Sequence, residues 1–346
     1  MKIKTLTITF AILLLFIQSC QKDEDIDLVT SDSSLKIFVK PNGDDSNSGL
    51  TYNNAVLSLK KVQEILYQLS PETDITVIID KGTYYPKQVT WTFTNDKKII
   101  FTAKEIASKP IFDGSEAGHG AWFVLKSSEG KNTNLNFKYL KIQNFLGGVT
   151  LRGDRDNKES GWNGNNHFYE MHFHNIGSKY TSTQAIGYSA VGISNSRNNS
   201  VVNCTFTNIE NNGTIGEERL IHAIYLSHYA SENLIVQNKF VNNSGGPIRT
   251  RDESNFNIIK ENSFIEAAGK AFYSEWYCDK SRLDYCTKPS GECESYGNEF
   301  LNNDCNKGYR GEIVKLIRLY RENENQPSYC AERTSPRVIS SGNILH

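Results

Sequence analysis

Short apolar segments recur along the chain from residue 135 to the C-terminus, with Asn at their ends and usually a Phe. They span residues 135–144, 201–208, 234–242, 258–265 and 297–302, with a degenerate last copy at 341–345. Equivalent apolar positions are Ile142, Phe173, Phe206, Phe240, Phe264 and Phe300, separated by 31, 33, 34, 24 and 36 residues. A constant motif with variable spacing predicts one coil per repeat, with loops of different length between the coils.

Within the copies, apolar and polar residues alternate over three to five positions, which is typical of short β-strands. Asn suits the corners between strands because it tolerates left-handed backbone angles, and stacked Asn side chains can hydrogen-bond along the axis. Earlier strands are expected within 74–84 and 98–102. Residues 55–69 have an amphipathic pattern, which predicts a helix that caps the open end of the solenoid.

The stretch Phe38-Val-Lys-Pro-Asn-Gly-Asp-Asp-Ser-Asn-Ser-Gly49, followed by the predicted helix and by Gly-Thr-Tyr84, resembles the N-terminal portion of many right-handed parallel β-helix proteins. The resemblance implies an all-β fold: a single-stranded right-handed parallel β-helix with an N-terminal capping helix, occupying residues 36–346. The regular coils are predicted from about residue 74 onward. The Asp-rich part of the stretch lacks the terminal carboxylate of an EF-hand loop and is interpreted as a turn; a Ca²⁺ site is the alternative.

The N-terminal residues have the pattern of an export signal. Two lysines within residues 1–4 precede an apolar run at 8–17, and Cys20 follows shortly after. The run is too short to cross a bilayer as a helix, and the arrangement is typical of a secretory signal. It resembles a bacterial lipobox, which implies removal of residues 1–19 and acylation of Cys20; an ordinary signal peptide with a chance cysteine is the alternative. Residues 20–35, acidic at their start, resemble the tether of Bacteroidota lipoproteins, which implies anchoring in the outer membrane, at the cell surface or on the periplasmic face.

Net charge and chain length limit the kinds of partner and the number of domains. The formal net charge of −1 gives no argument for a nucleic-acid partner. The roughly 320 mature residues fit one repeat domain, which we expect to be a monomer.

Export permits disulfides, and loops held by them are predicted within 278–330. The cysteines beyond the N-terminal region are Cys204, Cys278, Cys286, Cys293, Cys305 and Cys330. Their spacing lacks partner histidines at zinc-site distances, so no metal cluster is predicted.

A second strand precedes the Phe corner of each coil and offers a face for chemistry. These strands are expected at 148–152, 190–194, 223–227, 247–251 and 271–275. Alternation predicts inward side chains at Val149, Val191, Ile224, Ile248 and Phe272. One outward column then contains Thr150, Gly192, Tyr225, Arg249 and Tyr273, and the next contains Arg152, Ser194, Ser227, Arg251 and Glu275.

Adjacent rungs are about 4.8 Å apart, so the last three rungs are expected to form one patch. The patch comprises Tyr225, Arg249, Arg251, Tyr273 and Glu275; His222, His228 and Lys270 flank it, and Arg152 lies three rungs away. Arg side chains match carboxylate or sulfate oxygens, and Tyr offers a sugar-stacking face and a titratable hydroxyl. The patch therefore indicates a site for an anionic sugar. A network of Arg–Glu pairs and aromatic ladders that only stabilises an exposed sheet is the alternative.

The run Tyr-Leu-Ser-His-Tyr-Ala-Ser-Glu-Asn233, with Asn-Lys-Phe240, Ser-Gly-Gly-Pro-Ile-Arg-Thr-Arg-Asp252 and Asn-Ser-Phe264 after it, resembles β-helical polysaccharide lyases of the alginate lyase and chondroitinase B type. In that family a Lys on one rung and an Arg on the next carry the elimination. Arg251 matches the family's Arg, whereas Ser227 stands at the Lys position. The resemblance implies lyase chemistry but leaves the base open. The candidates are Tyr225, His222, His228, Lys270 and Tyr273.

The implied activity is β-elimination at a uronic acid of an acidic polysaccharide or its oligosaccharides, by a carbon–oxygen lyase. Arg249 and Arg251, or a bound cation, would neutralise the carboxylate and so acidify the C5 proton. Tyr225 or a flanking His would remove this proton, Tyr273 would protonate the leaving group, and a 4,5-unsaturated sugar would form. A sugar as leaving group makes the enzyme a lyase, and a hydroxyl at the non-reducing end makes it a dehydratase. A glycoside hydrolase, which needs two or three carboxylates at the face, and a non-catalytic glycan-binding lipoprotein are the alternatives.

Overall fold

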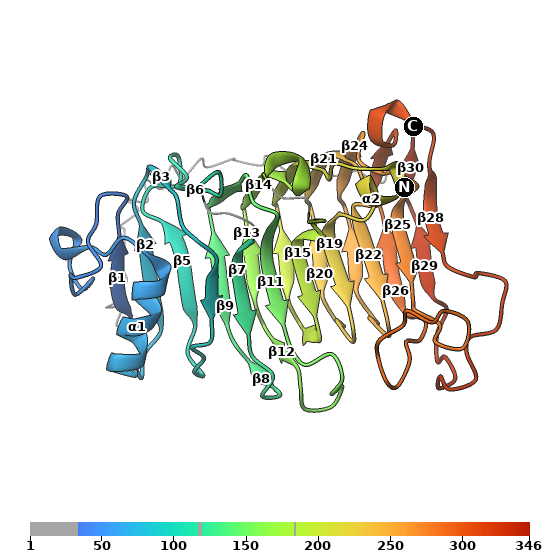
Figure 1. Cartoon of the computed structure of the whole chain (residues 1–346), viewed down its shortest axis with the longest axis horizontal. Helices are drawn as coiled ribbons and strands as arrows, with labels where there is room; N and C mark the ends of the chain where they lie inside the picture. Colours follow the sequence, from blue (N-terminus) through green and yellow to red (C-terminus); the bar gives the residue numbers. More distant parts are fainter. Residues whose placement is uncertain (1–33, 117–119, 183–184) are drawn as a thin grey trace, which may run out of the picture. The chain divides into compact units, whose positions relative to one another are not determined.

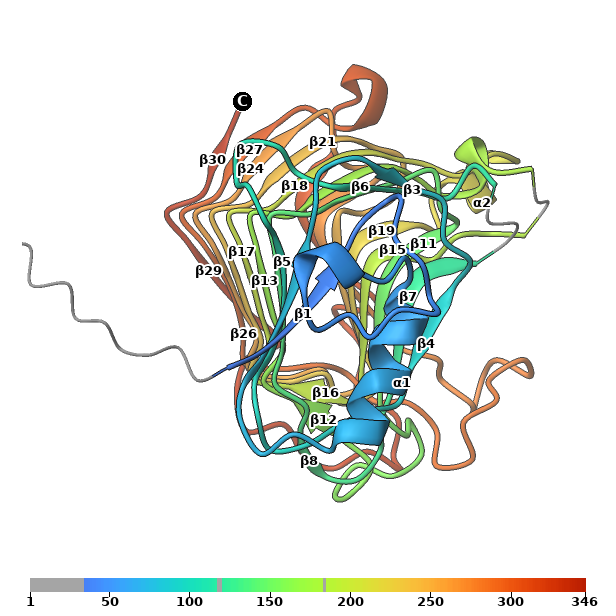
Figure 2. The same ribbon diagram turned by 90° about the vertical axis from the view of Figure 1, so that its left-hand side faces the viewer.

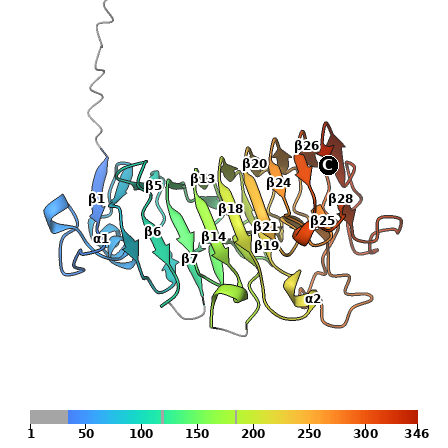
Figure 3. The same cartoon turned by 90° about the horizontal axis from the view of Figure 1, so that it is seen from above.

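The chain winds into a right-handed parallel β-helix in the computed structural model, which describes residues 34–116, 120–182 and 185–346 (Figure 1). The coils supply strands to three long sheets of ten, nine and eight strands, in which neighbouring strands run parallel. Figure 2 looks along the stack from its N-terminal end and shows the strands of each sheet superimposed. Figure 3 shows the coils following one another from the blue first strand to the red last strands. The predicted fold class is confirmed.

The described strands form three long sheets and one short sheet. The first sheet contains β1 (Leu35–Val39), β2 (Ile75–Ile79), β5 (Ile99–Ala103), β9 (Leu135–Lys138), β13 (His167–Tyr169), β17 (Ser200–Val202), β20 (Leu234–Val236), β23 (Ile258–Lys260), β26 (Asn298–Leu301) and β29 (Val338–Ser341). The second contains β3 (Thr83–Tyr84), β6 (Ile111–Asp113), β10 (Lys141–Gln143), β14 (His172–Ile176), β18 (Thr205–Ile209), β21 (Lys239–Asn243), β24 (Ser263–Ile265), β27 (Asp304–Asn306) and β30 (Ile344–Leu345). The third contains β4 (Val89–Trp91), β7 (Ala121–Lys126), β11 (Gly147–Arg152), β15 (Ser189–Ser194), β19 (His222–Ser227), β22 (Ile248–Arg251), β25 (Ala271–Trp276) and β28 (Lys315–Leu319). A short fourth sheet contains β8 (Lys131–Asn132), β12 (Asn163–Gly164) and β16 (Ser196–Arg197).

An aromatic column runs along the inside of the second sheet. It contains Ile142, Phe173, Phe206, Phe240 and Phe264, in register and fully buried. The four Phe rings stack at centroid distances of 5.0, 5.0 and 4.7 Å. Phe300, the predicted next member, is not part of this column: Cys305 pairs with Phe264, and Phe300 lies on the first sheet beside Ile259.

Two Asn corners in each later coil explain this error. One ladder contains Asn166, Asn199, Asn233, Asn257 and Asn298, and the other contains Asn238, Asn262, Asn303 and Asn343. Within both ladders each side-chain amide donates to the side-chain oxygen of the next Asn, at 2.7 to 3.0 Å. The predicted Asn-x-Phe motif at Phe300 therefore belongs to the first corner, and the true equivalent of Phe264 follows the second.

Helix α1 (Leu59–Leu69) covers the N-terminal end of the stack (Figure 2). It begins later than the predicted residue 55 because Ser58 caps it, with Oγ accepting a hydrogen bond from the backbone N–H of Lys61 at 3.1 Å. Its buried residues Leu59, Val62, Ile65 and Leu66 join the core. Strand β1 also pairs with β2, so the first coil begins well before the predicted start near residue 74.

Two disulfides staple the C-terminal loops, as predicted. Cys278 is bonded to Cys286, and Cys293 is bonded to Cys330. Cys204 and Cys305 are free and buried in the solenoid.

The predicted signal peptide, the lipidation site Cys20 and nearly all of the predicted tether lie outside the described residues. Their processing and the location of the protein stay predictions. Among the described helices, none is long and apolar enough to cross a membrane.

Candidate functional site

The outer face of the third sheet carries most of the predicted patch, and the strand register fixes which side chains are neighbours. One row across the strands contains Tyr225, Arg249, Ser274 and Arg318. The adjacent row contains Ser227, Arg251 and Trp276. Tyr225 and Arg249 therefore lie side by side, as expected, whereas strand β25 presents different residues from those expected.

Tyr273 and Glu275 point into the coil, which contradicts the prediction that they face outward. They pair with the inward residues Ile248 and Thr250, and the two residues are 0% and 2% exposed. The Tyr273 hydroxyl lies 2.8 Å from Thr250 Oγ1, and burial raises its pKa. Glu275 is bound by the buried Arg337. Tyr273 therefore cannot protonate a leaving group on this face, and Glu275 cannot bind a sugar there.

The physical reason is a register shift of one residue. Several coils begin their third-sheet strand with two consecutive inward side chains: Ala223 and Ile224 are both fully buried, as are Phe272 and Tyr273. Counting the alternation from Phe272, which is the first of its pair, puts every later residue of the strand on the wrong side.

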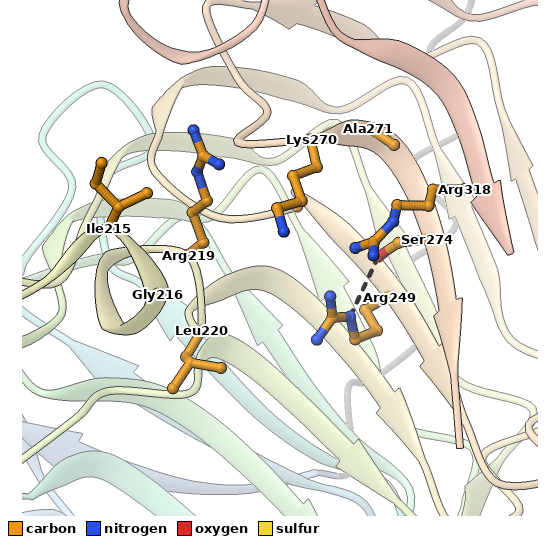
Figure 4. A pocket seen from close by; sticks show the side chains of 10 residues that line it. Ile215, Gly216, Arg219, Leu220, Arg249, Lys270, Ala271, Ser274 and Arg318 are labelled. Atoms are coloured by element: carbon orange, nitrogen blue, oxygen red, sulfur yellow. Dashed lines mark hydrogen bonds between the residues drawn. The ribbon is translucent and has the colours of Figure 1, made fainter. Parts of the chain in front are cut away.

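A cavity of about 330 Å³ lies between the third sheet and the loop that carries α2 (Ile215–Glu218) (Figure 4). Its lining residues are Ile215, Gly216, Arg219, Leu220, Gly246, Arg249, Lys270, Ala271, Ser274 and Arg318. Four of these described residues are cationic and none is acidic. In Figure 4 the side chains of Arg249, Ser274 and Arg318 lie together, and Arg249 Nε donates to Ser274 Oγ at 3.2 Å.

Most of this positive charge is uncompensated. Arg219 pairs with Glu312 at 3.0 Å. By contrast, Arg249, Lys270 and Arg318 form no ion pair within the described part of the chain. The positive charge of Arg318 is the main cause that lowers the pKa of Lys270, and burial is the main cause that lowers the pKa of Arg249. Such a cluster favours an anion with several oxygen atoms.

His222 lies behind Tyr225 as a neutral imidazole. It is 2% exposed, and its Nδ1 lies 2.6 Å from the carbonyl oxygen of Gly246. Because a carbonyl oxygen only accepts, Nδ1 carries the proton. Burial, helped by the charge of Arg249, holds the pKa of His222 well below its usual value, so Nε2 keeps its lone pair. The His222 and Tyr225 ring centroids are 5.1 Å apart, and the outward Tyr225 is the better placed of the two to meet a ligand.

Arg251 is already bound by an acid, which differs from its predicted role as a carboxylate ligand. Its Nε and NH2 donate to the two oxygens of the buried Glu292 at 2.7 and 2.6 Å, and its guanidinium lies 4.6 Å from the Trp276 ring centroid. Its NH1 donates to the Tyr225 hydroxyl at 3.2 Å. Burial opposes the charge, but Tyr225 and Glu292 outweigh burial and raise the pKa of Arg251. Arg251 therefore positions the Tyr225 hydroxyl.

His228, a predicted substrate ligand, lies in a buried cluster beyond the strand ends and does not line the cavity. Its Nδ1 is 2.9 Å from Asp252 Oδ2, and Lys288 Nζ is 2.5 Å from the same oxygen. Ligand atoms of His228, Asp252 and Glu292 lie within 4.8 Å of one another. A cation could fit such a spacing, but Lys288 and Arg251 already supply positive charge to both carboxylates.

The Asp-rich segment near the N-terminus forms a turn, as interpreted. Asp45 Oδ1 accepts hydrogen bonds from the backbone N–H groups of Leu57 and Ser58, both at 2.9 Å, and Oδ2 accepts from Ser58 Oγ at 2.7 Å. These bonds join the segment to the start of α1. A Ca²⁺ requirement stays a prediction without support from this carboxylate.

Arg152 lies three rungs from Arg251 through Ser194 and Ser227, as expected.

Three residues of the site were not predicted from the sequence: Arg219, Glu292 and Arg318. A signal for the last existed, because Leu316 and Ile317 both pack toward the core and are followed by an outward Arg318 and then Leu319. This is the inward-pair pattern of the other coils. Arg219 and Glu292 lie in loops without a repeating pattern and gave no signal.

Comparison with known proteins concerns the architecture. No family model matches the chain, and no curated protein is similar to it in sequence. A solved alginate lyase from Paenibacillus sp. str. FPU-7 aligns with 90% of this chain and 95% of its own, at 12% identity and a TM-score of 0.49. Pectin methylesterase PemA from Erwinia chrysanthemi aligns over 89% of both chains at 12% identity and a TM-score of 0.41. A rhamnogalacturonan lyase aligns over 83% of this chain and 86% of its own at 15% identity and a TM-score of 0.38.

Proposed function

We propose that the protein degrades an acidic polysaccharide or its oligosaccharides by β-elimination at a uronic acid, giving a 4,5-unsaturated sugar. The observation that carries the proposal is the cavity over β22, β25 and β28, where Arg249, Lys270 and Arg318 gather without an acidic lining residue. A planar carboxylate suits guanidinium groups, which can bind both of its oxygens at once. A neutral sugar would leave these charges without a partner.

Arg249 and Arg318 are assigned to the uronate carboxylate. Their charge stabilises the electron density that moves into the carboxylate when the C5 proton leaves, so the proton becomes more acidic. Tyr225 is the next side chain in the row beside Arg249 and is assigned as the base. Arg251 donates to its hydroxyl oxygen and stabilises the phenolate that takes the C5 proton. The phenolic proton leaves to solvent beforehand, because burial and Arg249 hold the pKa of His222 well below its usual value and make its imidazole a poor acceptor.

Lys270 takes the role of general acid that Tyr273 cannot fill. It lines the cavity, and its neighbouring arginines lower its pKa, which makes its ammonium group a readier proton donor to the departing C4 oxygen. The C5 proton thus goes to Tyr225, the C5–H electron pair forms the C4–C5 double bond, and the C4–O bond breaks. This sequence serves a lyase and a dehydratase equally.

Hydrolysis has less support from the same geometry. A glycoside hydrolase needs at least two carboxylates at the reacting face. Glu292 and Asp252 are bound by Arg251 and Lys288, and Glu275 points into the coil. No described carboxylate lines the cavity.

The test is to identify the product and remove the base. Wild-type protein is incubated with alginate, ulvan, glycosaminoglycans and pectin, and products are followed by absorbance near the ultraviolet edge and by mass spectrometry. Tyr225→Phe is expected to lower the rate by about a hundredfold or more, as loss of a general base does, while Tyr285→Phe, a change at an exposed loop tyrosine, leaves it intact. Saturated ends on every glycan would refute elimination, and a binding role would follow if no glycan were cleaved.

A further inference from the structure

A second cavity, of about 390 Å³, lies on the same outer face of the third sheet, toward its N-terminal strands. Its lining residues come from β7, β11, β15 and the segments before them: Gln88, Ala121, Val124, Lys126, Leu146, Gly147, Thr150, Arg152, Ile186, Gly187, Tyr188 and Ser189. The proposed reaction makes no use of this cavity.

The lining of the second cavity also combines positive charge with an aromatic ring. Lys126 and Arg152 are neighbours in register and both are exposed. Neither forms an ion pair in the described ranges of the chain. The Tyr188 side chain is 60% exposed at the same cavity. Two free cations beside an exposed aromatic ring are suited to a sugar that carries an anionic group.

One row of the outer face runs between the two cavities. Thr150, Gly192, Tyr225 and Arg249 follow one another in register, which spans three rungs, or roughly 14 Å. Gly192 places no side chain on the face at this point. The three atoms nearest to a Cβ added there would be Ser189 Oγ at 2.7 Å and two atoms of Thr150 at 3.7 and 3.8 Å. Gly192 itself is buried by its neighbours. A chain of sugars that reaches both cavities would lie over these neighbours, with no side chain of residue 192 in its way.

We propose that the second cavity is a distal subsite for a polyanionic glycan that lies along the helix axis, with an anionic group on Lys126 and Arg152 and a sugar ring on Tyr188. The inference rests on the proposed function and deepens it, because it makes the preferred substrate an oligomer that spans both cavities. Short uronates would use only the cationic cavity over β22, β25 and β28.

The test measures binding, not turnover. Uronate oligosaccharides of increasing length are titrated calorimetrically into Tyr225→Phe protein, with and without Lys126→Ala and Arg152→Ala together. Long oligosaccharides should bind about tenfold more weakly to the double change, which removes two charged contacts, whereas disaccharides should change by less than about twofold. Lys239→Ala, at an exposed lysine on the second sheet, is the matched control. Unchanged binding of long oligosaccharides, or equal loss for short and long ones, would overturn the subsite.

Two further variants separate the possible failures. Gly192→Leu should crowd Ser189 and Thr150 at the second cavity and weaken only the long oligosaccharides, because these residues do not line the cationic cavity. Arg249→Ala should weaken oligosaccharides of every length. If Arg249→Ala has this effect and the Lys126 and Arg152 changes have none, the distal subsite is wrong and the cationic cavity stands. If no variant affects binding of any length, both the subsite and the proposed function fail.

Discussion

The two arginines of strand β22 stand two residues apart on the same outer face and have opposite surroundings. Arg249 opens into a cavity that no described acidic residue lines, whereas Arg251 is bound by the buried Glu292. The strand itself does not distinguish them. The difference comes from the loops: residues 278–296 bring a carboxylate over the strand ends, and the loop with α2 brings another cation, Arg219, over the strand starts.

This contrast separates a structural charge from one available to a ligand. A guanidinium that already holds a carboxylate through two hydrogen bonds has few donors left for an incoming anion. Arg251 uses its third nitrogen on Tyr225. Toward the described residues, Arg249 donates only from Nε, to the neutral hydroxyl of Ser274. The same residue type therefore positions the base at one end of the strand and is free for substrate at the other.

The largest expected effect is a loss of stability on opening the disulfides of the C-terminal loops. Replacing Cys293 and Cys330 by Ser opens a disulfide of sequence separation 37 and should lower the free energy of unfolding by about 3–4 kcal/mol. Opening Cys278–Cys286, of separation 8, should cost less. Denaturant melts measure both. Oligosaccharide binding at the cavity should persist under native conditions, because its cations lie on or beside β22, β25 and β28. If binding were lost while the protein is still folded, the C-terminal loops would be needed for the cavity as well as for the surroundings of Arg251.

Arg249→Ala should have the opposite result, with turnover lost and stability retained. Turnover is expected to fall about a hundredfold, as it does when one donor to a developing charge is lost, and the melting temperature should hardly move. Arg251→Ala should lower the melting temperature more, because it leaves Glu292 buried without its counter-charge. Unsaturated product formation and thermal melts of both variants provide the comparison. Equal thermal losses would show that Arg249 is structural too.

Glu292→Gln tests whether the clamp acts on the site through Arg251. The change keeps the shape but removes the charge, so we expect a loss of about 1–3 kcal/mol in stability and a drop in kcat of roughly tenfold, since Tyr225 is then less well positioned. KM should stay nearly constant because Glu292 does not touch the cavity. Glu292→Asp should recover part of kcat. A change confined to KM would place Glu292 in substrate binding instead.

The coils were predictable from sequence because their determinants are local and repeated. Phe206 and Phe240 recur with an Asn before each, and Asn pairing joins the rungs of the later coils. The site was predictable only in part. Tyr225 and Arg249 follow from alternation, but Tyr273 was misplaced because two inward residues start the strand. Glu292 was invisible, because a loop folded back by disulfides carries no periodicity that relates it to the strands it covers.

The smallest expected effect is a shift in pH dependence within the cavity. Lys270 acts as an acid only when protonated, so the rate should fall as pH rises through its pKa, which Arg318 lowers more than any other neighbour does. Arg318→Gln removes the main cause, the pKa of Lys270 rises, and the alkaline limb of the kcat profile should move to higher pH, although the plateau falls with the loss of a carboxylate ligand. Arg219→Gln should move the limb in the same direction by less, since Arg219 is the weaker influence, and Lys270→Met should remove the limb altogether. A limb that keeps its position in Arg318→Gln, or that survives in Lys270→Met, would take the acid role away from Lys270.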